Sequence, residues 1–165
     1  MARLILEPTP LYRGTATPDT DWDDRILELA VYWRSLAPVP QIPSRKSFDP
    51  LDLVHLMPHL WLCDVDLSPF RMTIRLVGTE LTQFIGREIT GEDVNTAFER
   101  FADSGMEADA RQIINEGRPL LYAGPPVLTK DKNFLTLQRI TVPFASDGRR
   151  VDKLLGLSLA EYSET

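Results

Sequence analysis

Residues 61–91 read WLCDVDLSPFRMTIRLVGTELTQFIGREITG, and this stretch decides the fold. Apolar residues alternate with polar ones through 61–66 and again through 71–77, and the Leu67-Ser68-Pro69-Phe70 segment between them has the composition of a turn. Alternation with a period of two is typical of strands that bury one face. The stretch therefore predicts an antiparallel hairpin with one buried side.

The second strand of this hairpin leads directly into a short helix. Three apolar residues of the strand recur at every second position and are predicted to share its buried face: Met72, Ile74 and Leu76. Gly78 ends the strand, and Thr79 is predicted to cap a helix that runs through Phe84. Gly86 stands where a glycine that terminates a helix is expected.

The clearest helix lies before the hairpin, over residues 20–37. Thr20 is a good N-cap, and Pro38 stops the helix. Its apolar stripe includes four candidates for a dimer interface: Trp22, Ile26, Leu29 and Trp33. Two tryptophans on one stripe bury a large area. The stripe packs either on a second copy of the helix or on the sheet of its own chain. A second short helix is predicted over 51–57, after the N-cap Asp49.

Helical segments and then strands follow residue 91. Residues 92–116 are predicted to be helical in two pieces that break near Ser104-Gly105. Three strands come next, at 119–129, 134–144 and 151–160. Two strands first and three last, with helices between them, predict a single α+β domain.

The composition excludes several classes of protein. A chain of 165 residues suits one domain, and a net charge of -6 is unfavourable for binding nucleic acid or an anionic membrane. No apolar run approaches the roughly 20 residues of a membrane span. The N-terminal apolar run is too short for a signal peptide, and the single cysteine, Cys63, excludes an internal disulfide. We expect a cytoplasmic protein that binds neither nucleic acid nor membrane.

The order of these elements resembles a PAS domain, in which helices between the second and third strands cover one face of a five-stranded antiparallel sheet. Several segments look like the stand-alone PAS family common in alphaproteobacteria: Pro43–Pro50, Leu56–Leu60, Phe70–Thr79, Gly86–Gly91 and Val142-Pro143-Phe144 before Asp147-Gly148. The resemblance covers roughly residues 21–160. It implies a PAS-like five-stranded sheet with helices on one face, preceded by an N-terminal amphipathic helix.

This resemblance implies a division of the chain into four parts. Residues 1–19 are a flexible arm, 20–60 an N-terminal helical extension, 61–160 the PAS-like core, and 161–165 a tail. Relatives in the broader family are sensory and interaction modules, and some of them bind haem, flavin or small metabolites. None of these groups is implied for a named residue, so the cofactor stays open.

In PAS domains the space between helices and sheet is the ligand pocket. The residues that we expect to line it are Leu76, Phe84, Phe98, Phe101 and Tyr122, with Arg75 as a cation that can bind a ligand carboxylate or phosphate. The same aromatic residues would also fill the core of a ligand-free domain. Arg75 would equally form a salt bridge with Asp64 or Asp66 across the hairpin.

The reactive residue types fit structural roles better than catalytic ones. His55 and His59 are four residues apart, but a metal site needs a third ligand and Pro58 disturbs the helix, so we predict neither metal nor haem. Cys63 lies on a predicted strand, whereas the reactive cysteine of flavin-binding PAS-like photosensors sits in a helix within an asparagine-rich motif. We predict an inert, buried thiol. No pair of nucleophile and base is recognisable, so no residue is predicted to be catalytic.

The sequence thus predicts a sensory or regulatory module that binds a small molecule or a protein partner and is not an enzyme. The expected partners are a second copy of the chain, a small-molecule ligand and a signalling protein. Two alternatives stay open: a ligand-free interaction domain that dimerises, and a small α+β enzyme. A pocket would favour the sensor, and a closed core would favour the interaction domain.

Overall fold

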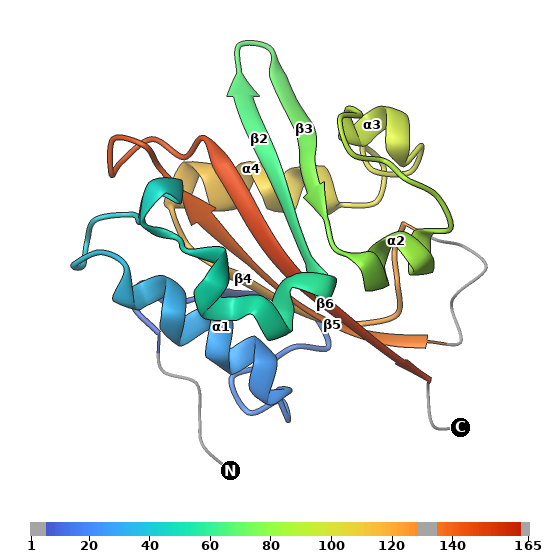
Figure 1. Ribbon diagram of the computed structural model, residues 1–165, viewed down its shortest axis with the longest axis horizontal. Helices are drawn as coiled ribbons and strands as arrows, with labels where there is room; N and C mark the ends of the chain where they lie inside the picture. Colours follow the sequence, from blue (N-terminus) through green and yellow to red (C-terminus); the bar gives the residue numbers. More distant parts are fainter. Residues whose placement is uncertain (1–5, 129–134, 163–165) are drawn as a thin grey trace.

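The computed structural model describes residues 6–128 and 135–162, which form a six-stranded sheet with helices on both faces (Figure 1). The strands in chain order are β1 (Leu11–Gly14), β2 (Leu60–Leu67), β3 (Phe70–Val77), β4 (Leu120–Gly124), β5 (Leu135–Phe144) and β6 (Lys153–Tyr162). Across the sheet the order is β1-β4-β5-β6-β2-β3. All neighbouring pairs are antiparallel except β1 and β4, which are parallel. The α+β class is confirmed.

Strand β1 is the difference from the predicted five-stranded antiparallel sheet. It lies in the segment predicted to be a flexible arm. The backbone N–H of Leu11 donates to the carbonyl of Pro119 at 2.8 Å, and that of Thr15 donates to the carbonyl of Ala123 at 2.8 Å. The arm prediction was wrong for residues 11–14, because a four-residue edge strand that begins after Pro10 is too short to show periodicity.

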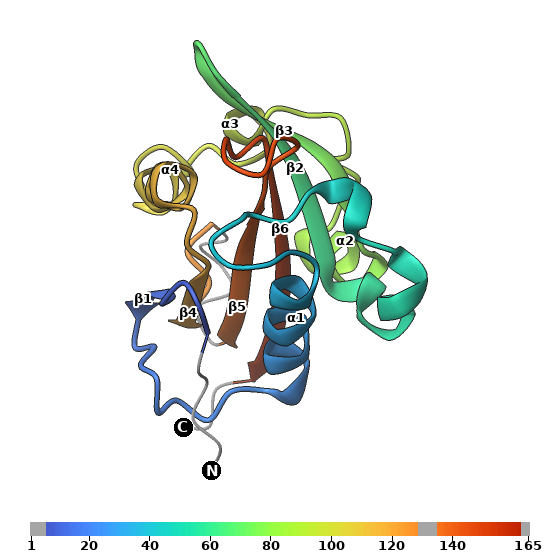
Figure 2. The same ribbon diagram turned by 90° about the vertical axis from the view of Figure 1, so that its left-hand side faces the viewer.

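Helices cover both faces of the sheet. They are α1 (Asp24–Ser35), the 3-10 helices η1 (Arg45–Ser47) and η2 (Pro50–His59), α2 (Thr79–Ile85), α3 (Val94–Ala97) and α4 (Met106–Glu116). Helices α1 and η2 pack on one face, and α2, α3 and α4 on the other. Figure 2 shows α1 and α4 on opposite sides of β5. The helices predicted on one face are α2, α3 and α4, and the predicted N-terminal amphipathic helix, α1, covers the other face together with η2.

The N-terminal helix packs on the sheet of its own chain. Its four candidate dimer residues are buried, with exposed fractions of 6% for Trp22, 0% for Ile26 and Leu29, and 1% for Trp33. The indole Nε1 of Trp33 donates to the carbonyl oxygen of Pro143 on β5 at 2.7 Å. These side chains therefore cannot form a surface for a second copy. The dimer-interface interpretation of this stripe was wrong, and its intramolecular alternative describes the structure.

Helix α1 also begins later than predicted. Its N-cap is Asp23, whose carboxylate accepts a hydrogen bond from the backbone N–H of Arg25 at 2.9 Å. Thr20 instead accepts from the backbone N–H of Thr17 in the preceding turn. Both residue types are good caps, and the carboxylate lies closer to the first buried turn.

A β-bulge at Arg75 decides which face Leu76 occupies. Cys63 pairs with Ile74, but the preceding Leu62 pairs with Leu76, so Arg75 is an extra residue without a partner on β2. One extra residue inverts the alternation of a strand. Met72 and Ile74 therefore face α2 to α4, whereas Leu76 packs in the layer of α1 and η2. The prediction of one shared face was wrong for Leu76.

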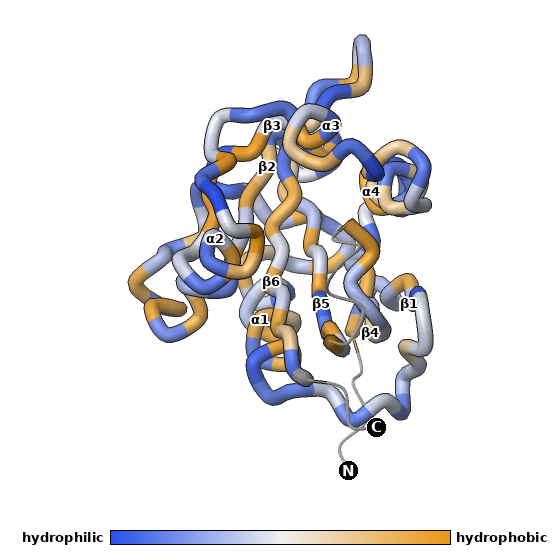
Figure 3. Tube along the Cα trace, turned by 90° about the vertical axis from the view of Figure 1, so that its right-hand side faces the viewer, coloured by the Kyte–Doolittle hydropathy of each residue, from blue (hydrophilic) through white to orange (hydrophobic). Residues whose placement is uncertain are grey.

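The last third of the chain follows the predicted order. β4 ends at Gly124 before two prolines, β5 begins at Leu135, and β6 extends to Tyr162. Residues 129 and 134, predicted as strand ends, lie outside the described residues. Figure 3 shows hydrophobic residues recurring along β5 and β6 in the centre of the protein. The helical segment 92–116 is reduced to α3 and α4, with turns between them.

Candidate functional site

A cavity of about 150 Å³ lies between the sheet and the helices that follow β3. Its walls are largely apolar and come from both layers: Cys63, Ile74 and Leu137 from the sheet, and Leu81, Phe84, Val94 and Phe98 from the helical side. A cavity of that volume lined by aliphatic and aromatic side chains is large enough for benzene. The site therefore has room for a molecule with one ring or a short branched chain.

The segment after α2 closes the cavity by pairing with the free edge of β3. The backbone N–H of Ile74 donates to the carbonyl of Glu92 at 2.9 Å, and the N–H of Gly91 donates to the carbonyl of Ile74 at 2.7 Å. These bonds hold Ile89 and Val94 against the sheet, where both are buried. Helix α2, by contrast, has no fully buried side chain. The wall formed by α2 is thus the less firmly packed one.

Three of the six predicted pocket residues line this cavity. They are Phe84, Phe98 and Phe101. Tyr122 is buried beside the cavity wall, and its hydroxyl donates to the carbonyl oxygen of Pro125. Leu76 lies on the opposite face of the sheet because of the bulge. The structure therefore brings together the predicted aromatic residues of the helical side, but not Leu76.

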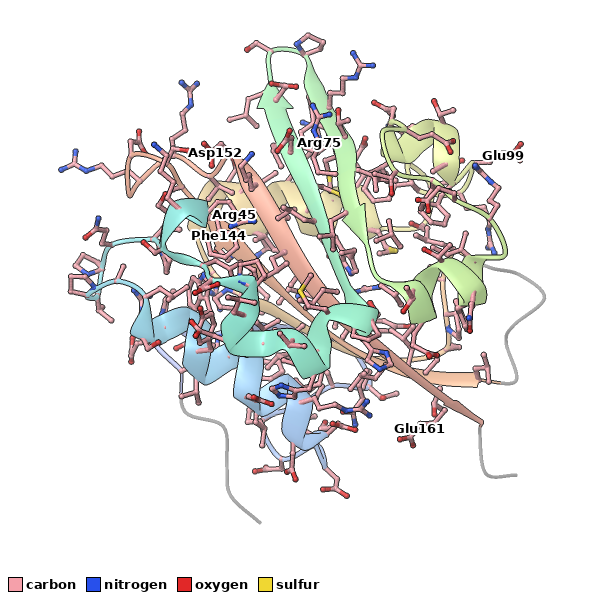
Figure 4. The ribbon with its side chains drawn as sticks, in the orientation of Figure 1. Arg45, Arg75, Glu99, Phe144, Asp152 and Glu161 are labelled. Atoms are coloured by element: carbon pink, nitrogen blue, oxygen red, sulfur yellow. The ribbon has the colours of Figure 1, made fainter. Side chains whose placement is uncertain are left out.

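Arg75 lies outside the cavity, on the exposed hairpin of β2 and β3 (Figure 4). Its Nε donates to one carboxylate oxygen of Asp64, and Lys153 Nζ donates to the other. Burial alone would raise the pKa of the Asp64 carboxyl, but these two hydrogen bonds outweigh burial and hold that pKa below its usual value. The salt-bridge alternative for Arg75 is confirmed, and the prediction that Arg75 lines the pocket was wrong.

Two polar residues in the cavity wall were not predicted from the sequence. Arg139 on β5 and Ser158 on β6 are directly opposite each other in the register, and both line the cavity. The guanidinium carbon of Arg139 lies 4.8 Å from the centre of the Tyr122 ring. An arginine inside the apolar run 135–144 was the signal that could have identified this position.

The cysteine and histidines do not form a reactive centre. Burial, together with the nearby Asp64 carboxylate, raises the pKa of the Cys63 thiol to about 12, so this thiol is protonated near neutral pH. His55 pairs with Glu28 at 2.7 Å, and His59 lies 3.5 Å from Arg25. Within residues 6–128 and 135–162, no three His, Cys, Asp or Glu side chains are grouped to hold a metal ion. In the same ranges, no helix is long and apolar enough to cross a membrane.

Comparison with known proteins gives one family. A family model described as a PAS domain matches residues 24–159, and no curated protein matches. Three similar solved structures carry LOV domains. A structure of RsLOV is 18% identical with a TM-score of 0.48, over 70% of this chain and 68% of the other. A fungal LOV-domain photoreceptor is 14% identical with a TM-score of 0.44, over 72% and 95%. An RNA-binding light-oxygen-voltage receptor is 15% identical with a TM-score of 0.44, over 74% and 35%.

Proposed function

Because this chain belongs to the PAS-domain family, we propose that it is a sensory or regulatory module that binds a small molecule in the cavity between its sheet and α2 to α4. The observation that carries this proposal is the apolar cavity of about 150 Å³. Protein interiors are close-packed, and unfilled cavities cost stability. A ligand that fills this space recovers the lost contacts.

Helix α2 is the element that we expect to respond to the ligand. It contributes Leu81, Phe84 and Ile85 to the cavity wall, yet none of its side chains is fully buried. Regions with few buried apolar contacts open more readily than the core. A ligand in contact with α2 would therefore fix this helix more firmly and change the surface that a partner protein meets.

We propose no catalysis at this site. Ser158 and Cys63 are the nucleophilic residue types in the cavity wall, and no histidine is among the described residues that line it. A serine or cysteine nucleophile needs an adjacent base or a lowered pKa. Cys63 has a raised pKa instead, so we expect no turnover.

Blocking the cavity tests the proposal. Ligand-observed NMR with a library of one-ring compounds is expected to find binders of the wild-type protein. Leu81→Trp replaces a leucine of the cavity wall with a bulky indole ring. These compounds should no longer bind to this variant. Gln83→Trp adds the same ring at an exposed position of the same helix and should leave binding unchanged.

Circular dichroism establishes that both variants are folded. An absence of binders to the wild-type protein would count against the cavity as a ligand site. So would binding of the same compounds to Leu81→Trp as to Gln83→Trp.

We also propose a homodimer, through a different surface from the buried stripe of α1. Val31 on α1 and Leu51 and Val54 on η2 are 64%, 78% and 59% exposed. The two elements are joined by a hydrogen bond from Tyr32 to Asp52 at 2.7 Å. Large exposed apolar side chains on neighbouring elements favour a protein contact.

Light scattering is expected to give twice the 18.7 kDa of one chain. A double variant, Val31→Glu with Val54→Glu, should give the mass of one chain. A wild-type protein that is monomeric at all concentrations would exclude the dimer. The net charge of -6 supports the further expectation that the partner is not nucleic acid or membrane. The single cysteine supports the proposal that the protein is cytoplasmic.

A further inference from the structure

A row of polar residues on the sheet runs from beside the cavity into its otherwise apolar floor. In the register of the sheet, Tyr122 on β4 is opposite Arg139 on β5, and Arg139 is opposite Ser158 on β6. Directly paired residues on one face of a sheet are close neighbours. Arg139 therefore lies between Tyr122 and Ser158 in the sheet, with its guanidinium group over the tyrosine ring.

No carboxylate in the described part of the chain forms an ion pair with Arg139. Among residues 6–128 and 135–162, no Asp or Glu lies within 4 Å of its guanidinium nitrogens, and its close contact is the Tyr122 ring. Asp109, the acid whose charge acts on it, already accepts a hydrogen bond from Arg13 Nε at 2.8 Å.

Arg139 nevertheless remains a cation. Burial lowers the pKa of its guanidinium to about 10, which leaves the group charged at neutral pH. A partly buried cation without a carboxylate partner among the described residues favours a nearby anion. An anionic group in the cavity would therefore be attracted to Arg139.

The hydroxyl group of Ser158 can donate a hydrogen bond to a ligand. Its hydroxyl oxygen accepts from the indole Nε1 of Trp61 at 3.2 Å, which leaves the hydroxyl proton for another acceptor. The indole lies directly on Gly156, where an added Cβ would be 1.9 Å from Trp61 Cε2. Gly156 thus makes room for the ring that orients Ser158.

From this arrangement we infer that the ligand is a small carboxylic acid with a compact apolar body. The carboxylate would bind Arg139 and Ser158, and the body would contact the aliphatic and aromatic walls. This inference rests on the proposed ligand-binding function of the cavity. One arginine and one hydroxyl suit the two oxygens of a carboxylate, whereas a phosphate dianion has three acceptor oxygens and more charge to neutralise. The volume of about 150 Å³ limits the body to about one ring.

Paired ligands that differ in charge but hardly in shape test this inference. The pairs are benzoate with benzamide, phenylacetate with phenylacetamide, and cyclohexanecarboxylate with its amide. Titration calorimetry and NMR titration are expected to show at least one acid that binds wild type about tenfold more tightly than its amide, as a charge-assisted contact predicts.

Arg139→Met should remove that preference and leave amide binding within about threefold of wild type, because only the charge-assisted contact is lost. This variant should fold, since Arg139 is only partly buried and has no carboxylate partner among the described residues. Replacing it by an apolar side chain of similar length removes a desolvation cost. Arg139→Lys is a second variant that keeps a positive charge and should retain part of the preference. Arg111→Met is the matched control. That guanidinium lies 4.0 Å from the Phe70 ring, and Arg111 does not line the cavity.

The outcomes separate this inference from the proposed function. Amides that bind as tightly as their acids, or acid binding that survives Arg139→Met, would overturn the carboxylate inference while the cavity remains a ligand site. An equal loss in Arg111→Met would also overturn it, since the effect would then be one of overall charge. Failure of every acid, every amide and the one-ring library would overturn the proposed function itself.

Discussion

Replacing Trp33 with alanine is expected to lower the free energy of unfolding by about 3–5 kcal/mol, the range for large aromatic residues in a core. The Trp33 side chain is 1% exposed and packs between α1 and the sheet. The change would leave a cavity there. It would also leave the carbonyl oxygen of Pro143 without the indole donor at 2.7 Å, in a buried position where lost hydrogen bonds are costly.

Urea denaturation measures this effect, and Ser35→Ala is the control on the same helix. Ser35 is exposed at the end of α1, so its truncation should change the free energy of unfolding by less than about 0.5 kcal/mol. The loss caused by Trp33→Ala should not depend on protein concentration, because α1 packs within one chain. A loss that grows on dilution would instead place Trp33 in a dimer interface and contradict the structure.

Gly78→Ala is expected to destabilise the protein by about 3 kcal/mol or more, at the upper end of what overpacking costs. A Cβ on Gly78 would lie 2.2 Å from the carbonyl oxygen of Met57 and 2.3 Å from that of Pro58. Those atoms belong to the backbone of η2, so they cannot rotate away as a side chain would. Since α2 begins at the next residue, the wall of the cavity should be displaced as well.

Gly86→Ala, at the other end of α2, is the comparison. Gly86 has a positive φ of 91° and open space around its Cα, so alanine there should cost only the backbone strain of about 1 kcal/mol. Urea midpoints with unchanged slopes would measure both losses. Equal, small losses of stability in the two variants would contradict the close contact between Gly78 and the backbone of η2.

The hairpin and the aromatic residues of the pocket could be predicted because patterns among neighbouring residues in the sequence indicate them. Alternation in 61–77 is visible in the sequence, and it gave β2 and β3. Phe84, Phe98 and Phe101 follow the hairpin in helical segments, and the PAS-like order of elements placed them over the sheet. Neither conclusion needed a contact between distant parts of the chain.

The positions of Leu76, Arg139 and Ser158 depend on how the strands pair, and no local sequence pattern shows that pairing. The bulge at Arg75 is a property of the β2–β3 register, and it moved Leu76 to the other face. Arg139 and Ser158 are 19 residues apart in the numbering and meet only because β5 and β6 pair. Helix α1 has an amphipathic pattern that fits a dimer and an intramolecular core equally well.

The position of a bound ligand tests most directly whether the cavity is the binding site. Isotope-filtered NOE spectra of the tightest one-ring binder should show contacts to methyl groups on the cavity side of the sheet and in α3: Ile74, Leu137 and Val94. Ile140 and Leu157 belong to the same sheet but face α1, and they should show none. Contacts to Ile140 and Leu157, or to the exposed Val31 and Val54, would contradict the assignment of the cavity as the binding site.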